Sequence, residues 1–262
     1  MTITITEQQL KILKPYTYEN YISELIEHCD KFFPHLNPTI GEENLRQVLR
    51  DAVEKAKQSG FTQRGPVQFY IDLLIVFGWG FETDPQYPWI KESLEKNNHL
   101  YQIEKADSLF FTARDYLKKI SGENNKYDYI IAETLKNFNF KDYLKILTRS
   151  EEQLFDLFYA VYPQKIETFG IENFKKILIE KNKKIKSTFS DKSSEWYLLV
   201  LFLEFLYGHQ FDNDPFLPFA SMTIKKADQY IDGTYYDSDQ NETAKMESLI
   251  KSWGNLKVYY TY

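Results

Sequence analysis

The sequence is poor in the residues that build turn-rich or disulfide-linked proteins. Its 262 residues include only 10 glycines, 9 prolines and one cysteine. So few glycines and prolines argue against a β-fold with many tight turns and against a disordered chain. The single cysteine, Cys29, excludes an intrachain disulfide, which fits a reducing compartment.

Long apolar runs and targeting signals are missing as well. The longest apolar run covers residues 196–203, far short of the ~20 residues that cross a bilayer. Residues 1–7 lack the basic start and the apolar centre of a secretory signal peptide. We therefore expect no membrane span, and the sequence predicts a cytoplasmic protein.

Motifs for catalysis or for cofactor binding are absent too. The chain has no Gly-x-Ser-x-Gly sequence and no phosphate-binding glycine loop. His28 and His35 lie near Cys29, but no second Cys/His pair exists to complete a zinc site. Residues 212–214 lack the glycine and the glutamate that a calcium loop needs at its sixth and twelfth positions. We expect no catalytic residue, no metal and no cofactor.

Basic charge is scarce, and the acidic charge is unevenly distributed. The net charge is −6, which argues against a nucleic-acid-binding surface. Residues 204–243 hold eight carboxylates and two lysines, so this segment alone carries the charge of the whole chain. It is interpreted either as a solvated acidic surface or as a site for a basic partner.

Helical periodicity and aromatic residues are plentiful. Apolar positions recur at helical spacing over residues 18–33 and 45–56. Residues 66–77 and 195–207 are apolar on nearly all sides, and we expect these two helices to pack together as the core. Further helices are predicted over residues 89–95, 99–120, 127–137, 151–162, 171–186, 217–231 and 242–253.

One stretch of sequence occurs twice. Gly78, Phe81, Asp84 and Pro85 recur 130 residues later as Gly208, Phe211, Asp214 and Pro215. Upstream, residues 41–49 match residues 170–178 at an offset of 129. The repeat predicts an all-α helical bundle built from two duplicated, similarly folded halves. Residues 1–147 form the first module with an N-terminal extension, and residues 148–262 form the second with an acidic loop and a C-terminal tail.

The repeated motif has a mechanical interpretation. Each glycine follows an apolar helix and suits the left-handed conformation that ends a helix. Phe81 and Phe211 are then expected to fold back onto the core. Asp84-Pro85 and Asp214-Pro215 are expected to cap and start the next helix, unless that helix starts later, at Pro88 and Pro218.

The first copy also resembles a known group of proteins. Gly60-Phe61-Thr62, residues 67–73, and then Gly78, Phe81, Asp84-Pro85 and Trp89 form the pattern. It is similar to small helical bacterial proteins that are often encoded beside type VI secretion effectors. The resemblance implies a cytoplasmic accessory protein, either an immunity protein or an effector-loading adaptor or chaperone. The second copy departs from the pattern, with Phe189-Ser190-Asp191 in place of Phe61-Thr62-Gln63.

Two classes of function follow, and a structural scaffold is a third possibility. The first is a non-enzymatic immunity protein that binds and neutralises a cognate secreted toxin; the second is an enzyme whose site is assembled from scattered residues. Tyrosine offers contact area at low entropic cost, and carboxylates steer a basic partner. The predicted partner-binding residues are Asp228, Tyr230, Asp232, Tyr235, Tyr236, Asp237 and Asp239. The sequence indicates no oligomeric state.

Overall fold

The computed structural model describes residues 6–96, 101–137, 151–188 and 194–218. All regular elements in these ranges are helices, so the predicted all-α class is confirmed. They are α1 Glu7–Phe32, α2 Leu36–Ile40, α3 Glu42–Gln58, α4 Arg64–Phe77, η1 Phe81–Thr83, α5 Pro88–Lys96, α6 Gln102–Ser121, η2 Glu123–Asn125, α7 Lys126–Lys136, α9 Glu151–Val161, α10 Pro163–Phe169, α11 Ile171–Thr188, α12 Ser194–Tyr207 and η3 Phe211–Asn213. Within the described ranges, no helix is long and apolar enough to cross a membrane.

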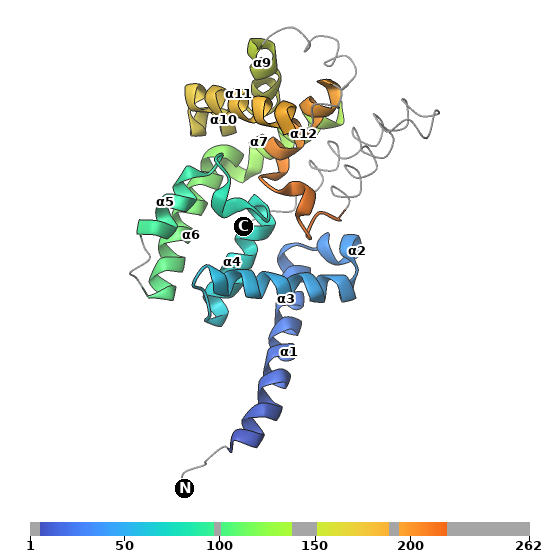
Figure 1. Ribbon diagram of the computed structural model, residues 1–262, viewed down its shortest axis with the longest axis vertical. Helices are drawn as coiled ribbons and strands as arrows, with labels where there is room; N and C mark the ends of the chain where they lie inside the picture. Colours follow the sequence, from blue (N-terminus) through green and yellow to red (C-terminus); the bar gives the residue numbers. More distant parts are fainter. Residues whose placement is uncertain (1–5, 97–100, 138–150, 189–193, 219–262) are drawn as a thin grey trace, which may run out of the picture.

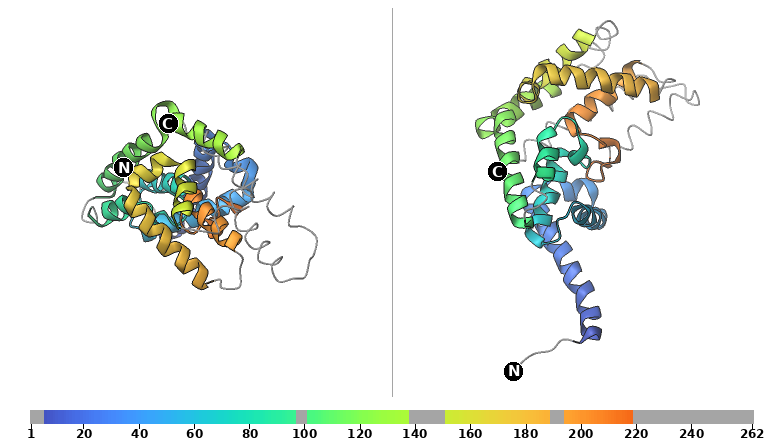
Figure 2. Two further views of the ribbon diagram at one scale, coloured as in Figure 1. Left: turned by 90° about the horizontal axis from the view of Figure 1, so that it is seen from above. Right: turned by 60° about the vertical axis from the view of Figure 1, so that its left-hand side comes forward.

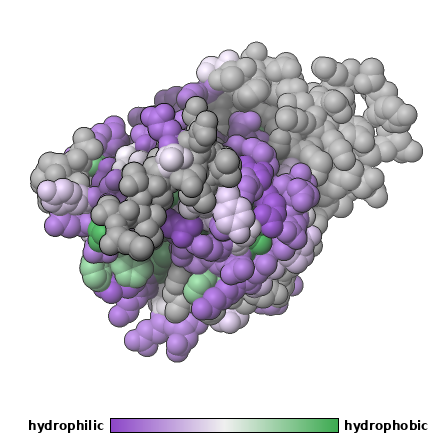
Figure 3. Space-filling model, turned by 90° about the horizontal axis from the view of Figure 1, so that it is seen from below, coloured by the Kyte–Doolittle hydropathy of each residue, from purple (hydrophilic) through white to green (hydrophobic). Residues whose placement is uncertain are grey.

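The molecule is elongated, with α1 projecting at one end and α9, α10 and α11 forming the other (Figures 1 and 2). Helices α4, α5 and α6 lie between these ends. Seen from the end at which α1 projects, the surface is mostly hydrophilic, and hydrophobic residues gather towards one side (Figure 3).

The first part of the chain packs through the apolar stripes that its sequence predicts. Helix α1 buries Ile22, Leu25 and Cys29 on one face, and α3 buries a matching stripe that runs from Leu45 to Ala56. Helix α3 packs against α1 on one side and α4 on the other, and α4 also packs against α6. Helix α4 is thereby covered by two other helices, which explains why its sequence is apolar on most sides.

The second part of the chain, α9 to η3, packs against α6 of the preceding part. Helix α10 packs against α6 and α11, and α11 packs against α12. Buried side chains from both parts form one continuous hydrophobic cluster. A joint core is what a chain of this size needs when each part has only a few helices.

The structure corrects several details of the sequence prediction. Helix α1 begins at Glu7 rather than near residue 18, and α6 begins at Gln102 rather than at residue 99. The short helices α2 and α10 were not predicted. Helices α4 and α12 do not pack along each other: α4 lies against α3 and α6, and α12 lies against α11. The predicted helices at 217–231 and 242–253 fall almost wholly outside the described residues.

The order of elements is the same in the two related parts of the sequence. A helix, a short helix, a long helix, an apolar helix and a 3-10 turn follow one another as α1–α2–α3–α4–η1 and as α9–α10–α11–α12–η3. The first helices differ in length, since α1 has 26 residues and α9 has 11. Descent of the two parts from one duplicated module stays a prediction.

Candidate functional site

The two copies of the repeated motif meet in space. Gly78 ends α4 with φ +94°, and Gly208 ends α12 with φ +93°. A Cβ atom on Gly78 would lie 2.5 Å from the carbonyl oxygen of Tyr207, and one on Gly208 would overlap the carbonyl oxygen of Phe77. The backbones therefore touch where each helix ends, in a place and a conformation that only glycine suits. We call residues 78–86 and 208–216 the paired corners.

Each corner binds the other through its aspartate. Asp84 Oδ2 accepts a hydrogen bond from the backbone N–H of His209 (2.7 Å), and Asp214 Oδ2 accepts one from the N–H of Trp79 (2.9 Å). The second oxygen of each carboxylate accepts an N–H from its own corner, that of Gln86 or Phe216. Four backbone donors at the joint are thereby satisfied, which makes it a fixed rather than a sliding contact.

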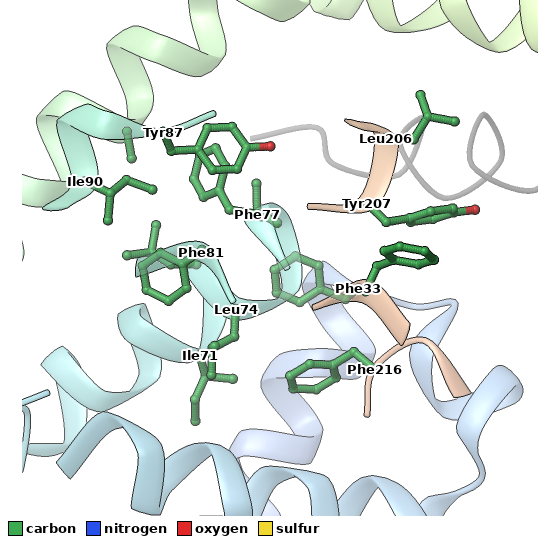
Figure 4. Close-up of a cluster of buried hydrophobic side chains, with 14 of the residues drawn as sticks. Phe33, Ile71, Leu74, Phe77, Phe81, Tyr87, Ile90, Leu206, Tyr207 and Phe216 are labelled. Atoms are coloured by element: carbon green, nitrogen blue, oxygen red, sulfur yellow. The ribbon is translucent and has the colours of Figure 1, made fainter. Parts of the chain in front are cut away.

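This arrangement corrects the predicted role of Asp84. The next helix, α5, begins at Pro88, so Asp84 does not cap it and Pro85 is not its first residue. The alternative start at Pro88 is the correct one. Phe81 and Phe211 are buried as predicted, with exposed fractions of 0% and 3%. Phe81 packs edge-on against Tyr70, with ring centroids 5.2 Å apart, and the side chains around the paired corners form an aromatic cluster (Figure 4).

The ionisation of Asp214 makes the joint sensitive to pH. Burial raises the pKa of Asp214 to about 7, although the N–H groups of Phe216 and Trp79 favour its ionised form. An unfolded aspartate titrates near pH ~3.9, so the folded protein holds this proton more tightly than the unfolded chain does. The stability that comes from the bound proton is complete below about pH 4 and is lost as the pH rises to about 7.

We expect Asp214→Asn to remove this pH dependence. In urea unfolding, the free energy of unfolding of the wild type relative to that of the variant should fall from about pH 4 to about pH 7. The free energy of unfolding of the variant should also fall by about 1–3 kcal/mol, because the amide nitrogen of the new asparagine side chain then faces a backbone N–H. Asp212→Asn, two residues away, is the matched control and should keep the slope. Parallel slopes in wild type and Asp214→Asn would contradict the assignment.

A charged cluster supports the second corner. Glu204 Oε1 accepts hydrogen bonds from Lys181 Nζ (2.6 Å) and His209 Nδ1 (2.8 Å). Burial alone would raise the pKa of Glu204, but the hydrogen bonds and charges of His209 and Lys181 outweigh it and lower this pKa. The cluster ties α11 and α12 to the corner, and each group in it has a structural partner.

A groove lies between α4 and α6 and is closed at one end by η2 and the start of α7. Its volume is about 860 Å³. The apolar part of its lining comes from one face of each of the two long helices, namely Phe69, Leu73 and Val76 of α4 and Phe110, Ala113 and Leu117 of α6. Phe69 and Phe110 meet edge to face across it, with ring centroids 5.8 Å apart.

Aromatic and apolar side chains are exposed beside the groove. Phe110 and Phe111 of α6 are 43% and 52% exposed, and Tyr129 and Ile130 of α7 are both 52% exposed. Phe110 and Tyr129 also line the groove. Large aromatic side chains left in water beside a concave surface are typical of a protein-binding site.

One charged side chain of the groove, Asp72, is bonded to a histidine of the fold. Asp72 accepts a hydrogen bond at 2.7 Å from His28 Nε2, and the other ring nitrogen of His28 is bonded to Gln68. Burial raises the pKa of Asp72, and the contact with His28 opposes that rise. Because both nitrogens of His28 are engaged, the ring is held as a structural link between α1 and α4.

The remaining charges lie at two different places on the groove. Arg114 lies over the ring of Phe111 at 5.0 Å and forms an ion pair with the adjacent Asp115 (3.1 Å), and Lys118 follows it one turn later on α6. Glu123 and Asp128 lie at the end formed by η2 and α7, where Asp128 accepts a hydrogen bond from the Tyr162 hydroxyl (3.3 Å). The groove thus has a basic edge and an acidic end.

The predicted partner-binding residues, Asp228 to Asp239, all lie outside the described residues. The groove was not predicted from the sequence, although two signals point to it. Phe110 and Phe111, like Tyr129 and Ile130, are apolar pairs that lie outside the helically spaced stripe that their own helix buries. Such pairs mark helices with a second apolar surface.

Comparison with known proteins gives no information on the site. No family model, no curated protein and no solved structure matches this chain. The functional conclusion therefore depends on the geometry of the site and on the resemblance of the sequence motif.

Proposed function

We propose that the protein binds a cognate secreted toxin in the cytoplasm and neutralises it, as an immunity protein of a type VI secretion-like system. The observation that carries the protein-binding part is the groove between α4 and α6, with exposed Phe110, Phe111, Tyr129 and Ile130 beside it. These side chains supply the rigid aromatic contact area on which protein interfaces depend. The type VI association rests on the sequence motif alone.

The proposal gives the protein no enzymatic turnover. Of the titratable groups described around the groove, Asp72 and Asp128 each have a hydrogen-bond partner within the fold. His28, whose imidazole bonds to the groove residue Asp72, is engaged at both nitrogens. A general base needs a lone pair directed at the substrate, and this arrangement offers none from His28.

Co-expression with the products of neighbouring genes tests the function. We expect one neighbouring product to be toxic alone, to be harmless with this protein, and to form a stable complex with it. An adaptor would instead leave the toxicity unchanged and raise the amount of effector secreted. A protein that binds no neighbouring product and relieves no toxicity would contradict the proposal.

The acidic segment is tested in the same complex. If Tyr235, Tyr236, Asp237 and Asp239 contact the partner, changing all four to Ala should weaken binding at least tenfold. The loss should be larger at low salt, because exposed carboxylates attract a basic partner over a distance that salt shortens. Equal affinity of variant and wild type at both salt concentrations would exclude this segment from the interface.

A further inference from the structure

The groove has the length and the wall pattern of a site for one more helix. Its α4 wall is formed by residues 69, 72, 73, 76 and 77, and its α6 wall by residues 110, 113, 114, 117, 118 and 121. Both sets follow the spacing of a single helix face. At 1.5 Å per residue, these walls are about 12 and 17 Å long, which corresponds to about two and about three helical turns.

A helix suits these walls better than an extended segment. The backbone groups of α4 and α6 are already bonded within their own helices, so the walls offer side chains and few free backbone partners. A strand placed there would bury N–H and C=O groups without partners, which is costly. A helix satisfies its own backbone and needs only an apolar face to fit between two others.

The charges of the groove indicate which side chains the bound helix carries and in which direction it lies. Lys118 and Arg114 line the α6 edge, and Arg114 also donates hydrogen bonds to the exposed carboxylate of its neighbour Asp115. The three charges leave this edge with a net positive charge, so acidic side chains of a partner would be stabilised there. Glu123 is exposed at the closed end, whereas Asp128 behind it is buried and bonded to Tyr162. A helix N-terminus carries partial positive charge that a carboxylate such as that of Glu123 stabilises. The N-terminus of the bound helix therefore belongs at the η2 end.

We propose that this groove receives an amphipathic helix of about two to three turns from the partner protein. Its apolar face lies on α4 and α6, its acidic residues face Arg114 and Lys118, and its N-terminus lies beside Glu123. This inference rests on the proposed function for the existence of a partner. It adds the location and the chemistry of the contact.

Designed peptides test the chemistry with the full-length chain. Three labelled peptides of one length carry leucines at helical spacing: one flanked by Glu, one by Lys, and one with the Glu flank and a central proline that breaks the helix. By fluorescence polarisation, the Glu-flanked helix should bind at least tenfold more tightly than the other two. Binding by none of the three, or equal binding by all, would overturn the proposal.

A charge reversal tests the orientation. The double variant Arg114→Glu/Lys118→Glu should prefer the Lys-flanked peptide over the Glu-flanked one. The matched control is Lys176→Glu/Lys183→Glu, which makes the same charge change at exposed positions on α11 and should keep the original preference. A preference that is unchanged in the first variant, or reversed in both, contradicts a specific role for Arg114 and Lys118.

Thiol labelling shows whether the groove is open. The native Cys29 is buried, so a Phe110→Cys variant adds one exposed thiol that should react with a maleimide as fast as that of a Tyr16→Cys control. The Glu-flanked peptide should slow the first reaction and leave the second unchanged. A Phe110→Cys thiol that reacts as slowly as Cys29 would assign the groove to a segment of this chain. A labelling rate of the Phe110→Cys thiol that decreases as the protein concentration increases would assign the groove to a second copy of this chain.

The outcomes for the groove and for the function are separable. If a toxin is captured and neutralised but Arg114→Glu/Lys118→Glu binds it as well as wild type, the function stands and the groove assignment fails. If the peptides behave as expected but no neighbouring product binds, the groove stands and the immunity function fails.

Discussion

Replacing Gly78 with Ala is expected to destabilise the protein by about 2–6 kcal/mol. A non-glycine residue at φ +94° is strained by roughly 1–3 kcal/mol. The new Cβ would also lie 2.5 Å from the carbonyl oxygen of Tyr207, which belongs to the backbone and cannot turn away. Relief of that overlap requires the two corners to separate, at a cost of about 1–3 kcal/mol more. Urea unfolding of the variant measures the loss.

Gly65→Ala is the matched control for this prediction. Gly65 lies in α4, like the residues before Gly78, and apart from its chain neighbours and the nearby backbone of its own helix, no atom lies within 4 Å of the position of its Cβ. Alanine there should leave stability unchanged or raise it by up to about 1 kcal/mol, because Ala favours the helix more than Gly does. If Gly78→Ala were as stable as Gly65→Ala, the close contact between the corners would be wrong.

The helices were predictable because each depends on a pattern within a short stretch of chain. The spacing of Leu45, Val48 and Leu49 determines which face of α3 is buried, and the structure buries that face. Helices α2 and α10, with 5 and 7 residues, are too short to show such a pattern. Their positions are set by contacts with other helices, such as that between α10 and α6.

The contact between the corners was beyond sequence reasoning for a different reason. The motif predicted that a helix ends at Gly78 and that Phe81 turns inward, and both follow from neighbouring residues. The hydrogen bonds of Asp84 and Asp214 instead join residues 125 and 135 positions apart. A local rule gave these aspartates the commonest local role, a helix cap, whereas one backbone donor of each comes from the other copy.

The groove illustrates a third limit. Phe69 and Leu117 lie on apolar helix faces, and from the sequence such faces are indistinguishable from core. Only the arrangement of α4 and α6 shows that part of these faces borders open space. The acidic, tyrosine-rich segment is conspicuous in composition, whereas the role of the groove side chains depends on how the helices pack.

Phe81→Ala is expected to cost about 3–5 kcal/mol, the usual loss when a buried aromatic ring is removed. Phe81 is fully buried, and its ring packs against Tyr70 behind the first corner. The surroundings cannot collapse into the vacated space without moving the backbone of the corner, which the hydrogen bonds of Asp84 and Asp214 hold in place. A loss of this size is a large part of the ~5–15 kcal/mol that stabilises a typical domain.

Two further variants show whether the corners act alike. Phe211→Ala removes the equivalent ring of the second corner, which is 3% exposed, and should cost a similar amount. Phe111→Ala removes a ring that is 52% exposed and should cost about 1 kcal/mol or less, mainly its contact with Arg114. Thermal and urea unfolding of the three variants should therefore separate Phe81→Ala and Phe211→Ala from Phe111→Ala. A Phe81→Ala melting curve that overlays the wild type would show that the ring does not support the corner, and the motif would then need another explanation than packing.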